Sequence, residues 1–437
     1  MPSRRFSRRV LLATVGSAIA ATAGCNAPAE SSETSPSNTT ADGPDSTHDG
    51  TDPSAGDDPQ ISLSGEDAWT TYGYEAGHSG YNPDAAGPAD DPGMVWNSSV
   101  EGIYTLREPA VAGGRVFVGS DQIMWAFDAA SGDSEWQRDL GGMAHHFSPT
   151  YRDDTLYVVA KDASGVNSEA AGSVRALNPE TGDRRWASSL PVTSTVAHDG
   201  DRLYVAAKAD GNGYVQTLDP DSGDRGWRFD VPDASESYVT AVPTYADGTV
   251  YVAATKVDGD GSTTGTLYAL DPESGDLDWT FDTESALSVA AVVANDRLHL
   301  AARGGRVHVL TLEGDEEWTE DVGARVYTRP TYANGRLFVL TAADIVAFDD
   351  GGTELWRAAS ERTQMTGMSV AGDTLYVGGE PLFALDVTDG SEIFDLPVGA
   401  YHGSYGAPVV VDDVMYAGIC IKEEPGSLYD NYVRAYV

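Results

Sequence analysis

Basic residues are scarce in this chain, and their positions are its first chemical signal. Lys and Arg together number 27 against 68 Asp and Glu, which leaves a formal net charge of −41 over 437 residues. All four lysines follow an aromatic residue in an apolar run, and Arg303 follows His299 in a similar run. A row of cations in an anionic protein attracts an acidic ligand or peptide segment. We therefore predict a cationic rim made of Lys161, Lys208, Lys256, Arg303 and Lys422.

Local neutralisation is the alternative interpretation of the same lysines. The number of residues from the aromatic to the cation varies between copies, so the side chains need not share one face of their strands. Each lysine also has an acid close by in the sequence, namely Asp162, Asp210, Asp258 or Glu423. The sequence leaves the rim and the local ion pairs as competing possibilities.

Patterns for catalysis and metal binding are weak. The sequence contains no Gly-x-Ser-x-Gly, His-Glu-x-x-His or Gly-Lys-Ser/Thr motif, so it indicates no nucleophile and no metal-activated water. His145, His146 and His402 could offer nitrogen donors to a metal, but no carboxylate spacing supports such a site. The loop 258–262 carries the first half of a calcium-binding pattern without the later Glu. We expect no catalytic residue and no metal site.

An internal repeat supplies the elements that must position these residues. The phrase at 126–136 returns at 176–186, 217–227 and 269–279. Each copy places an Asx residue and a Gly, which are turn formers, between two runs of alternating polarity, and a second Gly-containing hairpin follows. Each unit of about forty residues thus supplies four strands, which form one blade of a propeller.

Counting the aromatic residue that ends each copy gives the number of blades. The eight anchors are Trp96, Trp136, Trp186, Trp227, Trp279, Trp318, Trp356 and Phe394. After Phe394 the chain provides no further Trp strand, so the strand at Trp96 is expected to complete the last blade and close the ring. The predicted fold class is all-β, an eight-bladed propeller of four-stranded antiparallel blades. The anchors themselves are expected to pack between neighbouring sheets. Separate sandwich domains are the alternative, but no linkers separate the copies.

The loops after the Trp strands are the second candidate site. They lead to the innermost strands and open on the same face as the loops between second and third strands. This places their residues near the mouth of the central channel, where propellers commonly bind. The candidate mouth residues are Tyr104, Arg107, His145, His146, Tyr238, Arg325, Tyr327, His402 and Tyr405.

The N-terminal part of the chain predicts export and lipid anchoring. Residues 1–24 contain no acid, and Arg8 and Arg9 precede an apolar stretch, which resembles a twin-arginine signal peptide. Residues 22–25 resemble a lipobox with Cys25 as the lipidated residue. Residues 25–60 are acidic and poor in apolar side chains, which is typical of a disordered tether, and 61–437 form the propeller. We expect a cell-surface lipoprotein anchored to the outer face of the cytoplasmic membrane.

The charge of the chain bears on its surroundings. Removing the four arginines of the signal takes the net charge to −45 (−41 − 4), and the acids are spread through all repeats. Such a surface suits either cationic partners or concentrated salt, which screens the repulsion, and we favour salt. The combination resembles secreted lipoproteins of halophilic archaea. Nucleic acid is disfavoured as a partner.

The phrase at 269–279 resembles the repeat of pyrroloquinoline quinone (PQQ) type propellers, and the segments 69–73 and 80–83 resemble the lead-in of that group. The resemblance covers residues 66 to 437. It has two branches: quinoprotein dehydrogenases, which use the quinone, and proteins similar to the outer-membrane assembly lipoprotein BamB, which bind protein segments without it.

The dehydrogenase branch implies a disulfide between adjacent cysteines, a calcium held by Glu, Asn and Asp, and a catalytic Asp. This sequence has no adjacent cysteines, and the calcium ligands and the Asp have no assignable positions in it. We therefore expect no cofactor and a monomeric, non-catalytic scaffold that binds a protein segment or a ligand. The alternatives are a dehydrogenase that uses PQQ with calcium, and a sensor for a small anionic ligand.

Overall fold

The computed structural model describes residues 61, 63, 67–90, 92–102, 105–162, 169, 171–232, 236–359, 366–397, 406–421 and 430–437. These residues belong to the compact unit Gly56–Val437. The predicted signal peptide and tether lie outside the described residues. So do the candidate residues Arg8, Arg9, Cys25, Tyr104, His402, Tyr405 and Lys422.

The repeated phrase forms the hairpin between the third and fourth strands of a blade. In one copy the Asp271 N–H donates to Asp276 O at 2.9 Å, and the Gly275 N–H donates to Asp271 O at 2.9 Å. The Asp271 carboxylate accepts from the N–H groups of Glu273 and Ser274 at 2.9 and 2.7 Å. Gly275 has a φ of 75°, which glycine adopts at no steric cost. Local turn chemistry therefore positions every hairpin of this kind.

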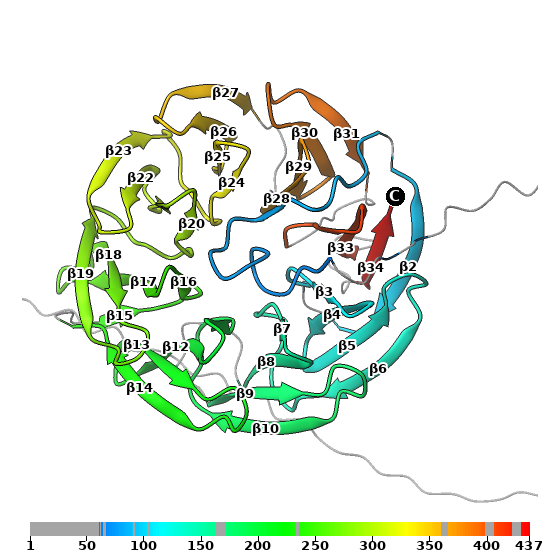
Figure 1. Ribbon diagram of the computed structural model, residues 1–437, viewed down its shortest axis with the longest axis horizontal. Helices are drawn as coiled ribbons and strands as arrows, with labels where there is room; N and C mark the ends of the chain where they lie inside the picture. Colours follow the sequence, from blue (N-terminus) through cyan, green and yellow to red (C-terminus); the bar gives the residue numbers. More distant parts are fainter. Residues whose placement is uncertain are drawn as a thin grey trace, which may run out of the picture. The chain divides into compact units, whose positions relative to one another are not determined.

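Eight sheets form the ring (Figure 1), and the predicted eight-bladed all-β fold is confirmed. The first three blades contain β3 (Ala110–Ala112), β4 (Arg115–Ser120), β5 (Ile123–Asp128) and β6 (Ser134–Asp139); β7 (Thr150–Arg152), β8 (Thr155–Lys161), β9 (Gly172–Leu177) and β10 (Arg184–Ser189); and β11 (Ala197–His198), β12 (Leu203–Ala209), β13 (Asn212–Leu218) and β14 (Arg225–Asp230). The fourth and fifth contain β15 (Glu236–Tyr238), β16 (Thr244–Ala246), β17 (Thr249–Val257), β18 (Thr263–Leu270) and β19 (Leu277–Thr283); and β20 (Val292–Ala294), β21 (Arg297–Ala301), β22 (Arg306–Thr311) and β23 (Glu316–Asp321). The last three contain β24 (Thr331–Ala333), β25 (Arg336–Leu340), β26 (Asp344–Asp349) and β27 (Glu354–Ala359); β28 (Gly367–Ala371), β29 (Thr374–Gly378), β30 (Leu382–Asp386) and β31 (Glu392–Leu396); and β32 (Val409–Val411), β33 (Val414–Ile421), β34 (Asp430–Tyr436) and β2 (Met94–Val100).

The two ends of the ordered chain close the ring in the last blade. Strand β2 pairs antiparallel with β34, with Trp96 opposite Ala435, as the aromatic count predicts. Gly93 and Val437 exchange two backbone hydrogen bonds of 2.8 and 3.0 Å beside this pair. Closure gives the last blade the outer strand that its own three strands lack, so this blade also has four antiparallel strands.

Each Trp anchor lies on an outer strand and joins its blade to the next one. The Trp186 indole N–H donates to Pro220 O of the next blade at 2.9 Å. Gly223, in the turn above, has a φ of 74°, and a Cβ on it would lie 2.5 Å from Trp186 Cε3. The same indole bond joins Trp96 to Ala129, Trp136 to Pro179, Trp227 to Pro272, Trp318 to Asp350 and Trp356 to Val387. The expected packing of anchors between sheets is therefore present, with a hydrogen bond across each of these boundaries.

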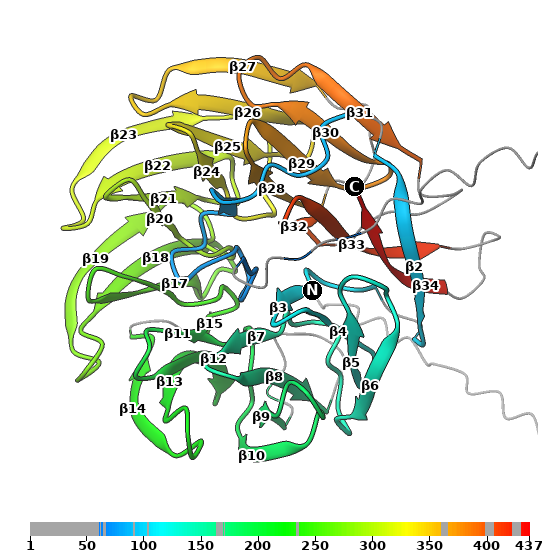
Figure 2. The ribbon, with the colours of Figure 1, turned by 45° about the vertical axis from the view of Figure 1, so that its right-hand side comes forward.

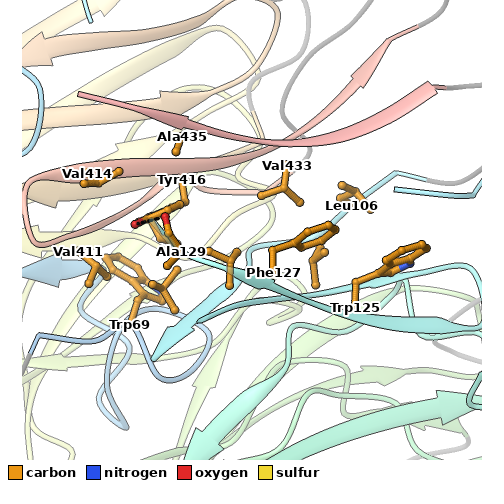
Figure 3. Close-up of a cluster of buried hydrophobic side chains, with 14 of the residues drawn as sticks. Trp69, Leu106, Trp125, Phe127, Ala129, Val411, Val414, Tyr416, Val433 and Ala435 are labelled. Carbon is orange, nitrogen blue, oxygen red and sulfur yellow. Dashed lines mark hydrogen bonds between the residues drawn. The ribbon is translucent and has the colours of Figure 1, made fainter. Parts of the chain in front are cut away.

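The core lies between neighbouring sheets. The cluster at the closing blade joins Phe127 of the first blade to Tyr416 and Val433 of the last, and Trp69 enters it from the N-terminal lead-in (Figure 3). Trp69 and Tyr416 are fully buried. Burying aromatic surface of this size is a dominant stabilising term in such a fold.

The lead-in runs through the centre of the ring, which the sequence analysis did not predict. We call residues 67–82 the axial segment; it is the blue ribbon among the inner strands in Figures 1 and 2. Its end forms β1 (Tyr81–Asn82), which pairs parallel with β28. Its carbonyl groups accept from inner strands of five further blades, through Val111, Tyr151, Tyr245, Val293 and Tyr332. Asn82 Nδ2 donates to Val410 O of the last blade at 2.8 Å. The axial segment therefore joins seven of the eight blades at the axis.

Candidate functional site

A buried ion pair holds the axial segment in place. Glu108 Oε1 accepts from the Trp69 indole N–H at 2.8 Å and from the Gly73 N–H at 2.7 Å. Its second oxygen lies 3.5 Å from Arg329 Nη2, and both side chains are 3% exposed. Gly80 allows this arrangement, because a Cβ there would lie 2.3 Å from Arg329 Nη1. Charges removed from water to this degree need each other and their hydrogen bonds.

Tyr72 of the axial segment lies above this pair. The Arg329 guanidinium is 5.0 Å from the centre of the Tyr72 ring, and burial raises the pKa of Tyr72. His78 places its ring nitrogens 2.6 Å from Tyr72 O and 3.1 Å from Pro243 O. Two carbonyl groups favour the imidazolium, but burial outweighs them and lowers the pKa of His78 to about 4. The imidazole is therefore neutral at neutral pH, and Arg329 is the cation beneath Tyr72.

A funnel opens above Tyr72 on the axis. Two adjoining hollows of about 250 and 110 Å³ share Tyr72, Arg107, Ser148 and Tyr327. Other parts of their walls come from loops that follow outer strands, including Thr193–Thr195, Ser288 and Thr366. We call this space the axial funnel, and the face on which it opens the loop face. It is the face on which the sequence analysis placed the candidate mouth residues.

Arg107 is the cation that lines both hollows of the funnel. Its side chain reaches solvent, while the surrounding wall lowers the pKa of Arg107 by desolvation. A guanidinium remains protonated at neutral pH despite such a shift. Among the residues that the structure describes, no carboxylate lies within 4.0 Å of Arg107. The funnel thus holds a positive charge that these residues leave unneutralised.

The two histidines of the mouth set lie beside each other on the same loop. The rings of His145 and His146 are 4.0 Å apart between centroids, and His146 lines the funnel. Burial lowers the pKa of both, to about 4 for His146. They are therefore neutral at neutral pH and add no charge to Arg107. Within the described ranges, no group of three His, Cys, Asp or Glu residues could hold a metal ion.

The structure buries two of the predicted rim lysines, Lys161 and Lys208. Lys161 is fully buried, its ammonium donates to Val192 O, and burial lowers the pKa of Lys161 to about 8. Lys208 is also buried and pairs with Glu236 at 2.7 Å, over the ring of Tyr238. Its partner is therefore Glu236, 28 positions away on the next blade, rather than Asp210. These two lysines do not line a common surface.

Lys256 and Arg303 stay nearer to solvent. Lys256 lies 5.5 Å from the ring of Tyr268, and the exposed Arg303 lies 5.6 Å from the ring of Tyr327. Arg303 lines an off-axis hollow together with two residues of the mouth set, Tyr238 and Arg325. The structure therefore brings one rim residue and two mouth residues together away from the axis.

Glu108, Arg329 and His78 are functional residues that were not predicted from the sequence. Glu108 and Arg329 are separated by 221 positions, and neither belongs to the repeated phrase. One feature of the sequence could have pointed to this site. Gly73 and Gly80 flank a segment in which polar and apolar residues do not alternate as they do in a strand. That pattern indicates close backbone approach without identifying the partner.

Comparison with known proteins identifies the family. The model of the family described as outer membrane protein assembly factor BamB matches residues 64–169, 170–291 and 263–418. The chain belongs to this BamB family. No curated protein matches the chain. In the described part of the chain, no helix is long and apolar enough to cross a membrane.

Solved structures similar to this BamB family member include two dehydrogenases and a BamB protein. The quinohemoprotein alcohol dehydrogenase of Comamonas testosteroni has a TM-score of 0.70 at 14% identity, over 84% of this chain and 80% of its own. A europium-containing methanol dehydrogenase has a TM-score of 0.70 at 12% identity, over 85% and 98%. BamB from Moraxella catarrhalis has a TM-score of 0.59 at 16% identity, over 79% and 99%. Identities this low show the fold alone.

Proposed function

We propose that this BamB family member is a non-catalytic scaffold whose loop face binds an acidic segment of a partner protein. The observation that carries the proposal is Arg107, a cation in the funnel with no carboxylate of a described residue within 4.0 Å, since the one acid of the wall, Glu108, pairs with Arg329. A guanidinium binds a carboxylate through two parallel hydrogen bonds, and a concave site strengthens that attraction. Because the chain has a net charge of −41, its surface repels most anions, and the funnel selects those whose carboxylates can pair with Arg107.

Tyr327 supports the same assignment from the funnel wall. Its side chain is 53% exposed, which makes it one of the exposed large hydrophobic residues of the described chain. Aromatic residues beside an arginine are typical anchors of binding surfaces, because they offer contact area at low entropic cost. Tyr327 links the two spaces. It lines the funnel together with Arg107, and its ring faces the guanidinium of Arg303, which lines the off-axis hollow.

A quinone with calcium, which the resemblance to PQQ-type propellers implies, does not fit the residues described around the funnel. Glu108 is the one acid that lines it there, and its oxygens serve Trp69, Gly73 and Arg329. Calcium needs six to eight oxygen ligands, usually with several carboxylates. Cys420 is buried in the core, where burial raises its pKa to about 12. We therefore propose no step through that cofactor.

The Arg107→Gln variant tests the proposal. We expect it to bind a fluorescent hexaglutamate peptide about tenfold more weakly than the parent protein, because one charged hydrogen-bonding group is lost. Fluorescence anisotropy over a range of NaCl concentrations gives the dissociation constants. Arg306→Gln, at an exposed position on β22, makes the same charge change away from the funnel and is the control.

The outcomes of this titration separate the alternatives. Equal affinities for Arg107→Gln and Arg306→Gln would remove the funnel from the binding surface. The affinity for hexaglutamine shows how much an uncharged peptide of the same length binds. Free glutamate that binds as tightly as the peptide would favour the second candidate, a sensor for a small anionic ligand.

We also propose that the scaffold is anchored by lipid on Cys25, which lies outside the described residues. A single thioether-linked lipid residue at the start of the mature chain would hold the propeller at the membrane through residues 25–60. Cys25→Ser is expected to move the protein from the membrane fraction to the soluble fraction. Asn26→Ser is the matched control, and a membrane-bound Cys25→Ser protein would contradict the anchor.

A further inference from the structure

A step between two blades creates a hollow away from the axis. In the fourth blade the second and third strands are long, with nine residues in β17 and eight in β18. In the fifth blade the corresponding strands β21 and β22 have five and six residues. Because a strand rises about 3.3 Å per residue, the hairpin of the fourth blade projects well beyond its neighbour. The short hairpin forms the floor of the hollow, and the long hairpin forms its wall.

This off-axis hollow has a volume of about 530 Å³ and an unusual lining for so acidic a protein. Among the described residues, its walls contain two arginines and no acid, although acids outnumber bases 68 to 27 in the chain. The lining residues are Tyr238, Thr240, Thr255, Val257, Thr263, Ser285, Ala286, Ser288, Arg303, Gly304 and Arg325. Guanidinium and hydroxyl groups both donate hydrogen bonds to carboxylate oxygens.

Neighbouring loops hold the two arginines by their backbones. The Arg303 N–H donates to Ala286 O at 2.9 Å, and Arg325 O accepts from the Ala342 N–H at 2.9 Å. Both side chains are exposed, and no carboxylate among the described residues lies within 4.0 Å of either guanidinium. The backbone anchors leave both side chains available to a ligand.

A serine on the same wall offers a further donor. Ser285 Oγ accepts from the Gly304 N–H at 2.9 Å, which leaves its O–H able to donate. Thr255, by contrast, donates to Leu287 O at 3.0 Å and has lone pairs rather than a proton to offer. The hollow therefore presents two charged donors and at least one neutral donor.

The hollow continues into the axial funnel. Thr240 and Ser288 line both spaces, so one groove leads from Arg107 on the axis to Arg303 and Arg325 between the blades. At about 530 Å³, the hollow is far larger than one carboxylate group. A groove of this size with cations at two separate places matches a chain molecule with several carboxylates better than a single small anion.

We propose that the off-axis hollow binds carboxylate side chains of the same acidic peptide segment whose other carboxylate pairs with Arg107. This inference rests on the proposed function and extends it by naming a second contact. The segment lies extended along the loop face, from the axis to the step between the fourth and fifth blades. Arg303 and Arg325 each pair with a carboxylate there, and the Ser285 hydroxyl donates to one of them.

The test uses the full chain with Arg303→Gln and Arg325→Gln, singly and together, and the same hexaglutamate probe. We expect each single change to weaken binding about tenfold and the double change to weaken it more, with no effect on free glutamate bound at Arg107. Arg306→Gln is again the control, since it lies on β22 of the same blade and outside the lining. Thermal unfolding of each variant should match that of the control.

Each pattern of results decides between the two proposals. If Arg107→Gln weakens binding and the hollow variants behave like Arg306→Gln, the off-axis contact is wrong and the scaffold proposal stands. If the hollow variants alone weaken binding, the off-axis contact stands and the funnel is wrong. A parent protein that does not distinguish hexaglutamate from hexaglutamine would overturn both.

Discussion

Replacing Glu108 with Gln is expected to lower the free energy of unfolding by about 3 to 5 kcal/mol, because Arg329 would keep its charge without its partner. Both side chains are 3% exposed, so solvent offers the guanidinium little compensation. Gln keeps an oxygen that can accept from the Trp69 and Gly73 donors, so the loss reports the charge pair above all. Denaturant unfolding monitored by tryptophan fluorescence measures it.

A surface ion pair provides the control for this prediction. Glu135 and Arg115 pair on the first blade with their side chains 30% and 24% exposed. Glu135→Gln should cost less than about 1 kcal/mol, as solvated pairs do. Replacing both buried partners, by Glu108→Gln with Arg329→Met, should recover part of the stability, because no charge is then left unpaired. Equal losses for Glu108→Gln and Glu135→Gln would show that the axial ion pair is not a main support of the ring.

Gly223→Ala is expected to cost about 3 kcal/mol or more, through two effects at one residue. Its φ of 74° disfavours any side chain, and the new methyl carbon would lie 2.5 Å from Trp186 Cε3 of the preceding blade. Either the indole or the turn must move, and both carry the bond from Trp186 to Pro220 O. Thermal and denaturant unfolding measure the loss.

Gly248→Ala separates the two effects. Gly248 has a φ of 75°, but a Cβ there would meet nothing within 4 Å. Its substitution should therefore cost only the backbone term, about 1 to 2 kcal/mol. Adding Trp186→Leu to Gly223→Ala should then cost less than the sum of the two single changes. If both glycine variants lose the same stability, contact with the anchor contributes nothing.

The blades could be predicted from the sequence because their causes are local. The hydrogen bonds of the turn at Asp271 span a few residues, and alternation of polarity needs only adjacent positions. Closure through Trp96 followed from counting, since the last repeat lacked one strand. The loop face followed from strand order in the same way.

The rim could not be resolved from the sequence because burial depends on how each strand end meets its neighbour. Lys161 and Lys208 occupy similar places in the repeat to Arg303, yet the first two are buried and the third is exposed. Arg303 stands at the end of the short hairpin of the fifth blade, whose strands have five and six residues. A variation of a few residues in strand length lies within the uncertainty of strand ends read from sequence.

By itself, the sequence determined the number of blades, the place of every aromatic anchor and the strand that closes the ring. These features depend on turns within a few residues and on the number of repeats, and both can be read from the sequence. Only the tertiary structure decided that residues 67–82 cross the axis, that Glu108 meets Arg329 there, and that Arg107 remains without a carboxylate among the described residues. The physical reason is distance along the chain. Contacts at the axis join residues up to several hundred positions apart, and no local pattern records which of them will meet.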